Sequence, residues 1–172
     1  IFLCRWFVRR EAAALERMSE HPGTPRLIGR FGKFGFAMEL IEGQTLDRKT
    51  IKDKPIIMEE LEVQIKHMHA LGVTHNDIRM SNLMIADNGK LKIIDFGGSI
   101  LKPKSLNIFM LLIFYITRTS DRIKLVKLKL EFQNERLSSE DLKLARFVSL
   151  SRFISRVWKK HIYKALKAKT NC

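Results

Sequence analysis

The sequence predicts an α+β fold, because helical and strand patterns alternate along its first two thirds. Apolar residues recur at helical spacing in residues 5–20 and 55–71, and short apolar runs typical of strands lie in residues 27–40 and 83–94. With 172 residues, of which 45% are apolar, the chain has room for one domain with a hydrophobic core. This composition excludes a wholly disordered chain.

The first helix is predicted for residues 5–20, where neither Gly nor Pro interrupts the apolar spacing. Residues 21–25 contain two prolines and a glycine, which predict the end of the helix and a turn. Two apolar runs within residues 27–40 are separated by Gly32 and Lys33, which favours a β-hairpin.

A second helix is predicted for residues 55–71. Pro55 lies near its start, where the missing N–H costs nothing, and Gly72 marks its end. The polar residues 47–54 before it are expected to form a loop or a short helix. Residues 73–82 after it are polar and are expected to be irregular.

A second hairpin is predicted from two short strands, residues 83–86 and 91–94. The connection contains Asn88 and Gly89, a pair that tight hairpin turns favour. This hairpin lies between the two motifs that carry the chemistry of the chain.

The second half is less regular. Residues 106–116 are almost wholly apolar and too short to span a bilayer, which favours a buried helix. Residues 126–132 alternate like a strand, but the dense charge also permits a helix, and both interpretations stand. Residues 138–141 resemble a helix capping box. A helical face is then expected at Phe147, Leu150, Ile154, Val157 and Trp158.

The charge of the chain is concentrated in this second half. Residues 1–98 carry 15 basic and 13 acidic side chains, whereas residues 99–172 carry 17 basic and 5 acidic ones. This excess fits peripheral contact with an anionic membrane surface or an anionic acceptor, and equally a solvated basic face. Nucleic acid is not expected as a partner, because no groove-reading motif is present. Only Cys4 and Cys172 are present, which favours a reducing, cytoplasmic location.

Two motifs flank the second hairpin. His75, Asp77 and Asn82 form the pattern His-x-Asp-x-x-x-x-Asn, and Asp95 begins an Asp-Phe-Gly triplet directly after the second strand. Phosphoryl transfer needs one carboxylate facing the acceptor hydroxyl, and hard oxygen ligands for the divalent metal that neutralises the phosphate. The hairpin between Asn82 and Asp95 would set both groups on one wall of a site.

These motifs resemble the catalytic loop and metal loop of the protein-kinase-like superfamily. More narrowly, residues 10–15, 21–27, 38–43 and 75–79 resemble the small bacterial lipopolysaccharide core kinases. The resemblance covers about residues 5–100. It implies a kinase fold that is mostly the helical C-lobe, with a remnant of the N-lobe in residues 1–40 and the C-lobe in residues 41–172. It also implies ATP and Mg²⁺ as cofactors.

The resemblance assigns a role to each matching residue. Asp77 would be the catalytic base, His75 would organise the loop, and Arg79 would approach the γ-phosphate. Asn82 and Asp95 would hold Mg²⁺. The remaining nucleotide contacts would come from the backbone of Glu39 and Ile41, against adenine, and from Glu11, which matches the helix Glu that pairs with an ATP-anchoring Lys.

Some expected features of the family do not occur in the sequence. No Gly-rich loop or strand Lys precedes Glu11, which indicates either an amino-terminally incomplete kinase or a minimal one. Asn76 replaces the Arg that grips a phosphorylated activation loop, and no Ala-Pro-Glu segment follows Asp95. The expected function is transfer of the γ-phosphate to a hydroxyl of a lipopolysaccharide sugar, a small molecule or a protein Ser/Thr. The alternative is an inert kinase-like binding module with a basic tail at the inner membrane face.

Overall fold

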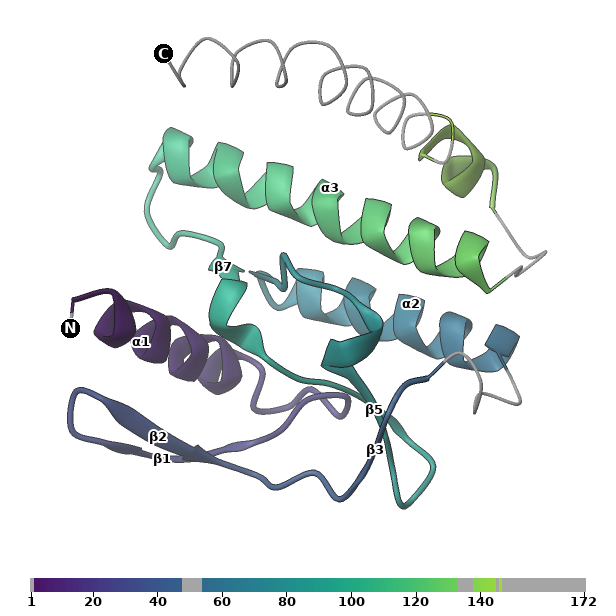
Figure 1. Cartoon of the computed structure of the whole chain (residues 1–172). Helices are drawn as coiled ribbons and strands as arrows, with labels where there is room; N and C mark the ends of the chain where they lie inside the picture. Colours follow the sequence, from purple (N-terminus) through teal and green to yellow (C-terminus); the bar gives the residue numbers. More distant parts are fainter. Residues whose placement is uncertain (1, 48–53, 133–137, 145, 147–172) are drawn as a thin grey trace, which may run out of the picture. The chain divides into compact units, whose positions relative to one another are not determined.

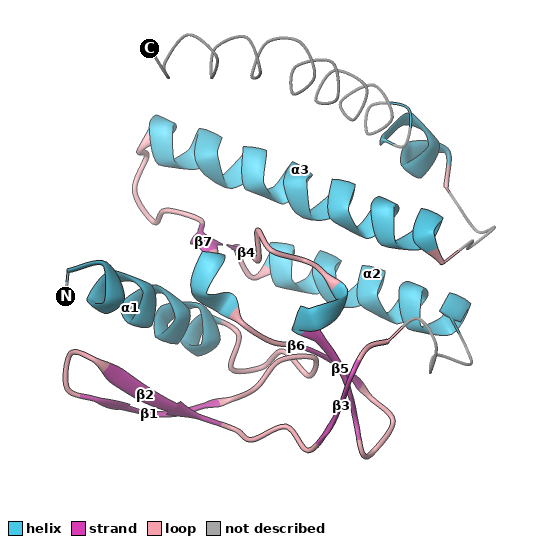
Figure 2. Cartoon of the chain, viewed as in Figure 1, coloured by secondary structure: helices cyan, strands magenta, loops and turns pink. Residues whose placement is uncertain are grey.

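The computed structural model describes residues 2–47, 54–132, 138–144 and 146. The chain divides into two compact units, Ile1–Asn134 and Glu135–Cys172. All predicted site residues belong to the first unit, whose helices and strands are shown in Figures 1 and 2. The boundary predicted at residue 40 stays a prediction.

The first helix and hairpin are confirmed. Helix α1 (Phe2–Arg17) begins and ends three residues earlier than predicted, and buries Leu15 and, just beyond its end, Met18. Strands β1 (Leu27–Phe31) and β2 (Gly35–Met38) then pair antiparallel. Gly32 begins their connection with φ of +58°, a left-handed conformation that glycine adopts at little cost.

Helix α2 (Lys54–Ala70) confirms the second helical prediction. Its buried face is formed by Met58, Leu61, Ile65 and Met68, which repeat every three or four residues. These side chains belong to one core with residues of α1, the strands and α3, the long helix described below.

A three-stranded antiparallel sheet supports the site, in the order β3 (Gly43–Thr45), β5 (Leu83–Ala86), β6 (Leu91–Ile93). The predicted hairpin corresponds to β5 and β6. Strand β3 was not predicted, because three polar residues show no alternation. Gly43 permits its close approach: a Cβ there would lie 2.2 Å from the carbonyl oxygen of Ile85.

The segment expected to be irregular contains short elements. Strand β4 (Val73–Thr74) pairs antiparallel with β7 (Ile100–Leu101). Two single-turn 3₁₀ helices overlap the ends of the chemical motifs, Met80–Asn82 before β5 and Phe96–Gly98 after β6. The β4–β7 pair therefore brackets both motifs and brings the segments that carry them together.

Helix α3 (Ile108–Glu131) settles the open question about the second half, because one helix of 24 residues covers both ambiguous stretches. The expected burial of residues 106–116 is wrong for most of the stretch, although Phe114 is buried. Leu106, Ile108 and Phe109 are 96%, 80% and 70% exposed, whereas Leu125 and Val126 later in the helix are buried. The physical reason is that α3 is longer than α2. The first turns of α3 lie beyond the end of α2 and therefore do not pack against it (Figure 1).

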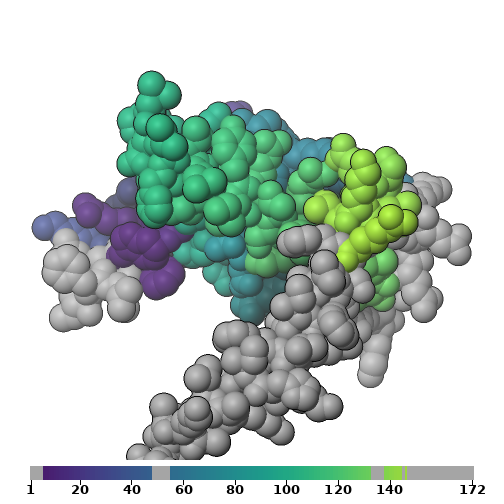
Figure 3. All heavy atoms as spheres, turned by 90° about the horizontal axis from the view of Figure 1, so that it is seen from above, coloured from purple at the N-terminus to yellow at the C-terminus, as the bar shows by residue number. Residues whose placement is uncertain are grey.

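The space-filling view shows the atoms of α3 on the visible face of the molecule (Figure 3). Among the described residues, no helix combines the length and apolar character needed to cross a membrane. The predicted capping box is present: Ser138 Oγ accepts the N–H of Asp141 at 3.0 Å, and Asp141 Oδ2 accepts the N–H of Ser138 at 3.2 Å. The helical face predicted from residue 147 onward lies outside the described residues.

Candidate active site

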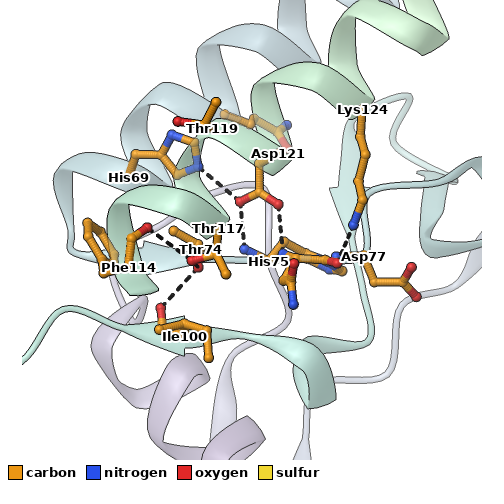
Figure 4. A network of polar contacts seen from close by, with 12 residues as sticks. His69, Thr74, His75, Asp77, Ile100, Phe114, Thr117, Thr119, Asp121 and Lys124 are labelled. Carbon is orange, nitrogen blue, oxygen red and sulfur yellow. Dashed lines mark hydrogen bonds and ion pairs between the residues drawn. The ribbon is translucent and has the colours of Figure 1, made fainter. Parts of the chain in front are cut away.

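The loop that carries the first motif is anchored by a buried carboxylate on α3. Asp121 is fully buried, and its two oxygens accept the backbone N–H groups of His75 at 2.8 Å and Asn76 at 2.7 Å (Figure 4). His69 on α2 lies 3.0 Å from the same carboxylate. Three donors thus compensate the buried charge and hold the loop against two helices.

Sequence reasoning missed Asp121 and His69. Both lie outside the motifs, and Asp121 is 45 residues from the nearest loop residue it binds, Asn76. One signal was available: Asp121 is the single acidic residue in residues 106–130, an otherwise apolar and basic stretch. An isolated carboxylate in such a helix indicates a buried partner.

His75 joins the two motifs. Its fully buried ring bonds the carbonyl oxygen of Ile94 through Nε2 at 3.0 Å, while Nδ1 accepts the N–H of Asp77 at 3.2 Å. The ring also meets Phe96 edge-on, with centroids 4.6 Å apart. These partners require the neutral Nε2–H tautomer. Burial lowers the pKa of His75, in agreement with that state.

The structure brings Asp77, Asn82 and Arg79 together. The side-chain amide of Asn82 donates to the Asp77 carbonyl at 3.0 Å and to its Oδ2 at 3.1 Å. Arg79 Nε lies 3.1 Å from the same Oδ2. Because the Asn82 nitrogen is committed to Asp77, its amide oxygen is left as an acceptor, approached by Ser81 Oγ at 3.3 Å.

Asp95 is placed beside this group by the register of the hairpin. Leu83 pairs with Ile93, and the N–H of Ile94 donates to the Asn82 carbonyl at 3.0 Å. Asn82 and Asp95 therefore lie at the same end of the β5–β6 hairpin. Asp95 is exposed and adopts a left-handed conformation with φ of +66°.

The donor set fits Mg²⁺. Within the described residues, no group of three or more His, Cys, Asp or Glu side chains forms a dedicated metal cage. Mg²⁺ does not require one, since it keeps several waters and binds through one or two protein oxygens beside substrate phosphates. The Asn82 amide oxygen and the exposed Asp95 carboxylate supply such hard oxygen ligands.

Glu11 on α1 lies next to the second motif. Its Oε1 accepts the N–H of Phe96 at 3.3 Å. Burial raises the pKa of Glu11 and the nearby charge of Asp95 raises it further, whereas the bond from Phe96 acts in the opposite direction. The described partner of Glu11 is thus a backbone N–H group and not the expected Lys.

Glu39 and Ile41 lie elsewhere, in the segment after β2. The Glu39 N–H donates to the carbonyl of Arg26 at 2.8 Å, and Glu39 Oε2 accepts the N–H of Arg26 at 3.1 Å. Both residues line an open pocket of about 290 Å³ together with Ala86 and Asp87. That pocket is at the turn end of the β5–β6 hairpin, opposite the end that carries Asn82 and Asp95.

Comparison with known proteins identifies the family to which this arrangement belongs. A family model described as the protein kinase domain matches residues 6–117, which include most of α1, both motifs and the start of α3. The chain belongs to the protein kinase domain family. The α+β kinase-like fold predicted from the sequence is confirmed by this match.

Three relatives of this kinase chain illustrate the likeness. It is 30% identical over 102 residues to "Hormonally up-regulated neu tumor-associated kinase homolog" of Xenopus tropicalis, covering 54% of the chain and 14% of that relative. It is 33% identical over 101 residues to "CBL-interacting protein kinase 19" of Oryza sativa subsp. japonica, covering 54% and 20%. It is 34% identical over 104 residues to "CBL-interacting serine/threonine-protein kinase 20" of Arabidopsis thaliana, covering 55% and 24%.

The matched part of the kinase chain therefore spans at most about a quarter of these relatives. All three come from an animal or a plant. They give no support to the narrower resemblance to bacterial lipopolysaccharide core kinases. The term serine/threonine describes the Arabidopsis relative that carries it in its name.

Proposed function

We propose that the chain forms part of an ATP- and Mg²⁺-dependent phosphotransferase that moves the γ-phosphate of ATP to a hydroxyl group. The observation that carries this proposal is the grouping of Asp77, Asn82 and Asp95 at one end of a rigid hairpin. His75 connects the segments that hold them.

In this proposal Asp77 orients the acceptor hydroxyl and receives its proton. The bond from the hydroxyl oxygen to the γ-phosphorus forms while the bond to the bridging oxygen of ADP breaks. Arg79 lies against Asp77 and presents positive charge to the phosphate. Asn82 and Asp95 hold Mg²⁺, which supplies charge neutralisation for the phosphate oxygens.

The nucleotide would lie along the β5–β6 hairpin. Backbone groups of Glu39 and Ile41 would meet adenine at the turn end, and the phosphates would reach Asn82 and Asp95 at the other end. A strand of four residues is about 14 Å long, which separates the two ends. Glu11 belongs to the phosphate end through its contact with Phe96.

The acceptor we propose is a Ser or Thr hydroxyl of a protein. The support is the likeness to plant and animal kinases, of which one is named a serine/threonine-protein kinase. A lipopolysaccharide sugar is the competing acceptor. Incubation with γ-labelled ATP and either a Ser/Thr peptide library or deacylated lipopolysaccharide distinguishes them, with Asp77→Asn as the blank.

A thermal-shift experiment on the full chain tests the nucleotide site. MgATP at a hundred times its dissociation constant stabilises a protein by about 2.7 kcal/mol, a rise of a few degrees for a chain of this size. Asp95→Asn should lose the Mg²⁺-dependent part of this rise. Glu20→Gln, which changes an exposed carboxylate outside the proposed nucleotide site, should keep it. A wild-type chain that does not respond to MgATP would refute nucleotide binding.

A second candidate function is a non-catalytic binding module, in which Glu11 would hold the Asp-Phe-Gly segment through its bond to the Phe96 N–H. Such a module would bind nucleotide without transferring phosphate. A thermal shift with MgATP together with no labelled product from either acceptor would select it.

We also propose peripheral contact with an anionic membrane surface from the cytoplasmic side. The support is the basic excess of residues 99–172. Co-sedimentation with phosphatidylserine vesicles should be strong at low salt and weak at 0.5 M salt. Equal binding to phosphatidylcholine vesicles would contradict the proposal.

A further inference from the structure

Lys124 on α3 reaches the loop that carries Asp77. Its Nζ donates a hydrogen bond to the backbone carbonyl of Asn76. Asp121, three residues earlier on the same helix, accepts the N–H of Asn76 at 2.7 Å. Residues three apart share one face of a helix, so a single face of α3 holds both polar backbone groups of Asn76. Figure 4 shows the Lys124 side chain directed from α3 toward Asp77.

Asn76 is the residue at which the loop needs such support. Its φ is +63°, and with Asp95 it is one of two non-glycine residues at positive φ in the described chain. Asn adopts this left-handed conformation more readily than most residues, yet at a cost that surrounding contacts must offset. Because Asn76 directly precedes Asp77, any rotation at Asn76 redirects the Asp77 carboxylate.

The charges around Lys124 fit this position. The carboxylates of Asp121 and Asp77 attract its ammonium group, while Lys127 and Arg79 repel it. Burial lowers the pKa of Lys124, and the two carboxylates oppose that shift. The two carboxylates and the bond to a carbonyl offset part of the desolvation of this ammonium group.

We propose that Lys124 is a positioning residue of the active site, which together with Asp121 locks the backbone of Asn76 and so fixes the direction of Asp77. Its catalytic consequence rests on the proposed phosphotransferase function. The restraint on the Asn76 backbone is a property of the loop and can be measured without any acceptor.

The test compares Lys124→Met with Lys124→Arg, which keeps a long cationic donor. Lys127→Met is the matched control, because it removes the same charge one turn further along α3. In the described structure Lys127 bonds no atom of the loop. The first readout is amide hydrogen exchange at His75 and Asn76 in the full chain.

Loss of a hydrogen bond from a charged donor makes local opening of the loop more favourable. Lys124→Met should therefore speed amide exchange at Asn76 about tenfold. The control Lys127→Met should match the wild type, and Lys124→Arg should return most of the protection. Unchanged exchange in Lys124→Met, or equal acceleration in Lys127→Met, would overturn the proposal.

The second readout is steady-state hydrolysis of MgATP. Lys124→Met should lower kcat about tenfold with KM for ATP nearly unchanged, because a misdirected Asp77 affects the transition state and not nucleotide binding. A rise in KM with unchanged kcat would overturn the role in positioning. If the wild-type chain neither binds nor hydrolyses ATP, the proposed function fails, and exchange at Asn76 still decides whether Lys124 locks the loop.

Discussion

His69 of α2 and Asp121 of α3 form a buried hydrogen bond of 3.0 Å, with side chains that are 3% and 0% exposed. This bond connects the two helices next to the loop that carries Asp77. Since Asp121 also accepts two backbone N–H groups of that loop, its carboxylate is the point at which helix packing and active-site geometry meet.

Replacing Asp121 should therefore destabilise the fold and the loop together. In Asp121→Asn one amide oxygen is left for three donors, and the loss should be about 3–5 kcal/mol in the free energy of unfolding. Urea denaturation measures it. Asp87→Asn, at an exposed turn, should change stability by less than about 0.5 kcal/mol. Equal effects of the two substitutions would contradict the anchoring role of Asp121.

Stability should fall in mild acid because of His75. Its folded-state pKa is depressed by burial, so between that value and the ordinary 6.5 the unfolded chain binds more protons than the folded one. The free energy of unfolding then decreases as pH drops below 6.5, by at most about 1.4 kcal/mol per pH unit for each such histidine. Protonation would also remove the Nδ1 acceptor of the Asp77 N–H.

Urea denaturation between pH 7.5 and 5.5 measures this dependence. Burial depresses the pKa of His21 in the same way, so the wild type should show the combined slope. The variant His75→Gln should be less stable at pH 7.5 but should lose part of the slope. A slope identical to that of the wild type would show that His75 titrates alike in both states.

Neutralising Glu11 should leave the stability of the protein unchanged or increase it. Its raised pKa means that the folded state favours the protonated carboxyl, so its contribution to stability is lost as pH rises through that pKa. At pH 7.5 Glu11→Gln should be at least as stable as the wild type, because the amide oxygen still accepts the Phe96 N–H. Thermal unfolding of the two proteins measures the difference.

Glu11→Ala separates the two effects of this side chain. It also removes the charge near Asp95 but leaves the Phe96 N–H without its acceptor, and should cost about 1 kcal/mol relative to Glu11→Gln. Equal stability of the Ala and Gln variants would mean that the bond to Phe96 contributes nothing.

Two phenylalanines in the first turns of α3 offer a matched test of burial. Phe109 is 70% exposed and Phe114 is 2% exposed on the same helix. Phe114→Ala should cost about 3–5 kcal/mol in unfolding free energy, whereas Phe109→Ala should change it by less than about 0.5 kcal/mol. A large loss in Phe109→Ala, measured by urea denaturation, would show that the start of α3 is covered in solution.

Local patterns were sufficient for most of the fold. The apolar spacing of α1 and α2 and the Asn88–Gly89 turn of the β5–β6 hairpin depend on neighbours within a few residues, and these elements were predicted with small errors at their ends. Strand β3 was missed because its three residues pair only with a distant strand, β5. The pattern of residues 126–132 was ambiguous, because the alternation of apolar and charged residues favoured a strand whereas the high charge density also permitted a helix.

The sequence by itself was sufficient to propose the chemistry of the site, since two short motifs contain Asp77, Asn82 and Asp95 at the required spacing. The tertiary structure decided what holds them. Asp121 and Lys124 reach the loop from α3, 45 and 48 residues away from Asn76 in sequence, and no local pattern predicts such contacts. Burial is equally non-local: the apolar residues at the start of α3 are exposed, because what covers a helix depends on where neighbouring helices end.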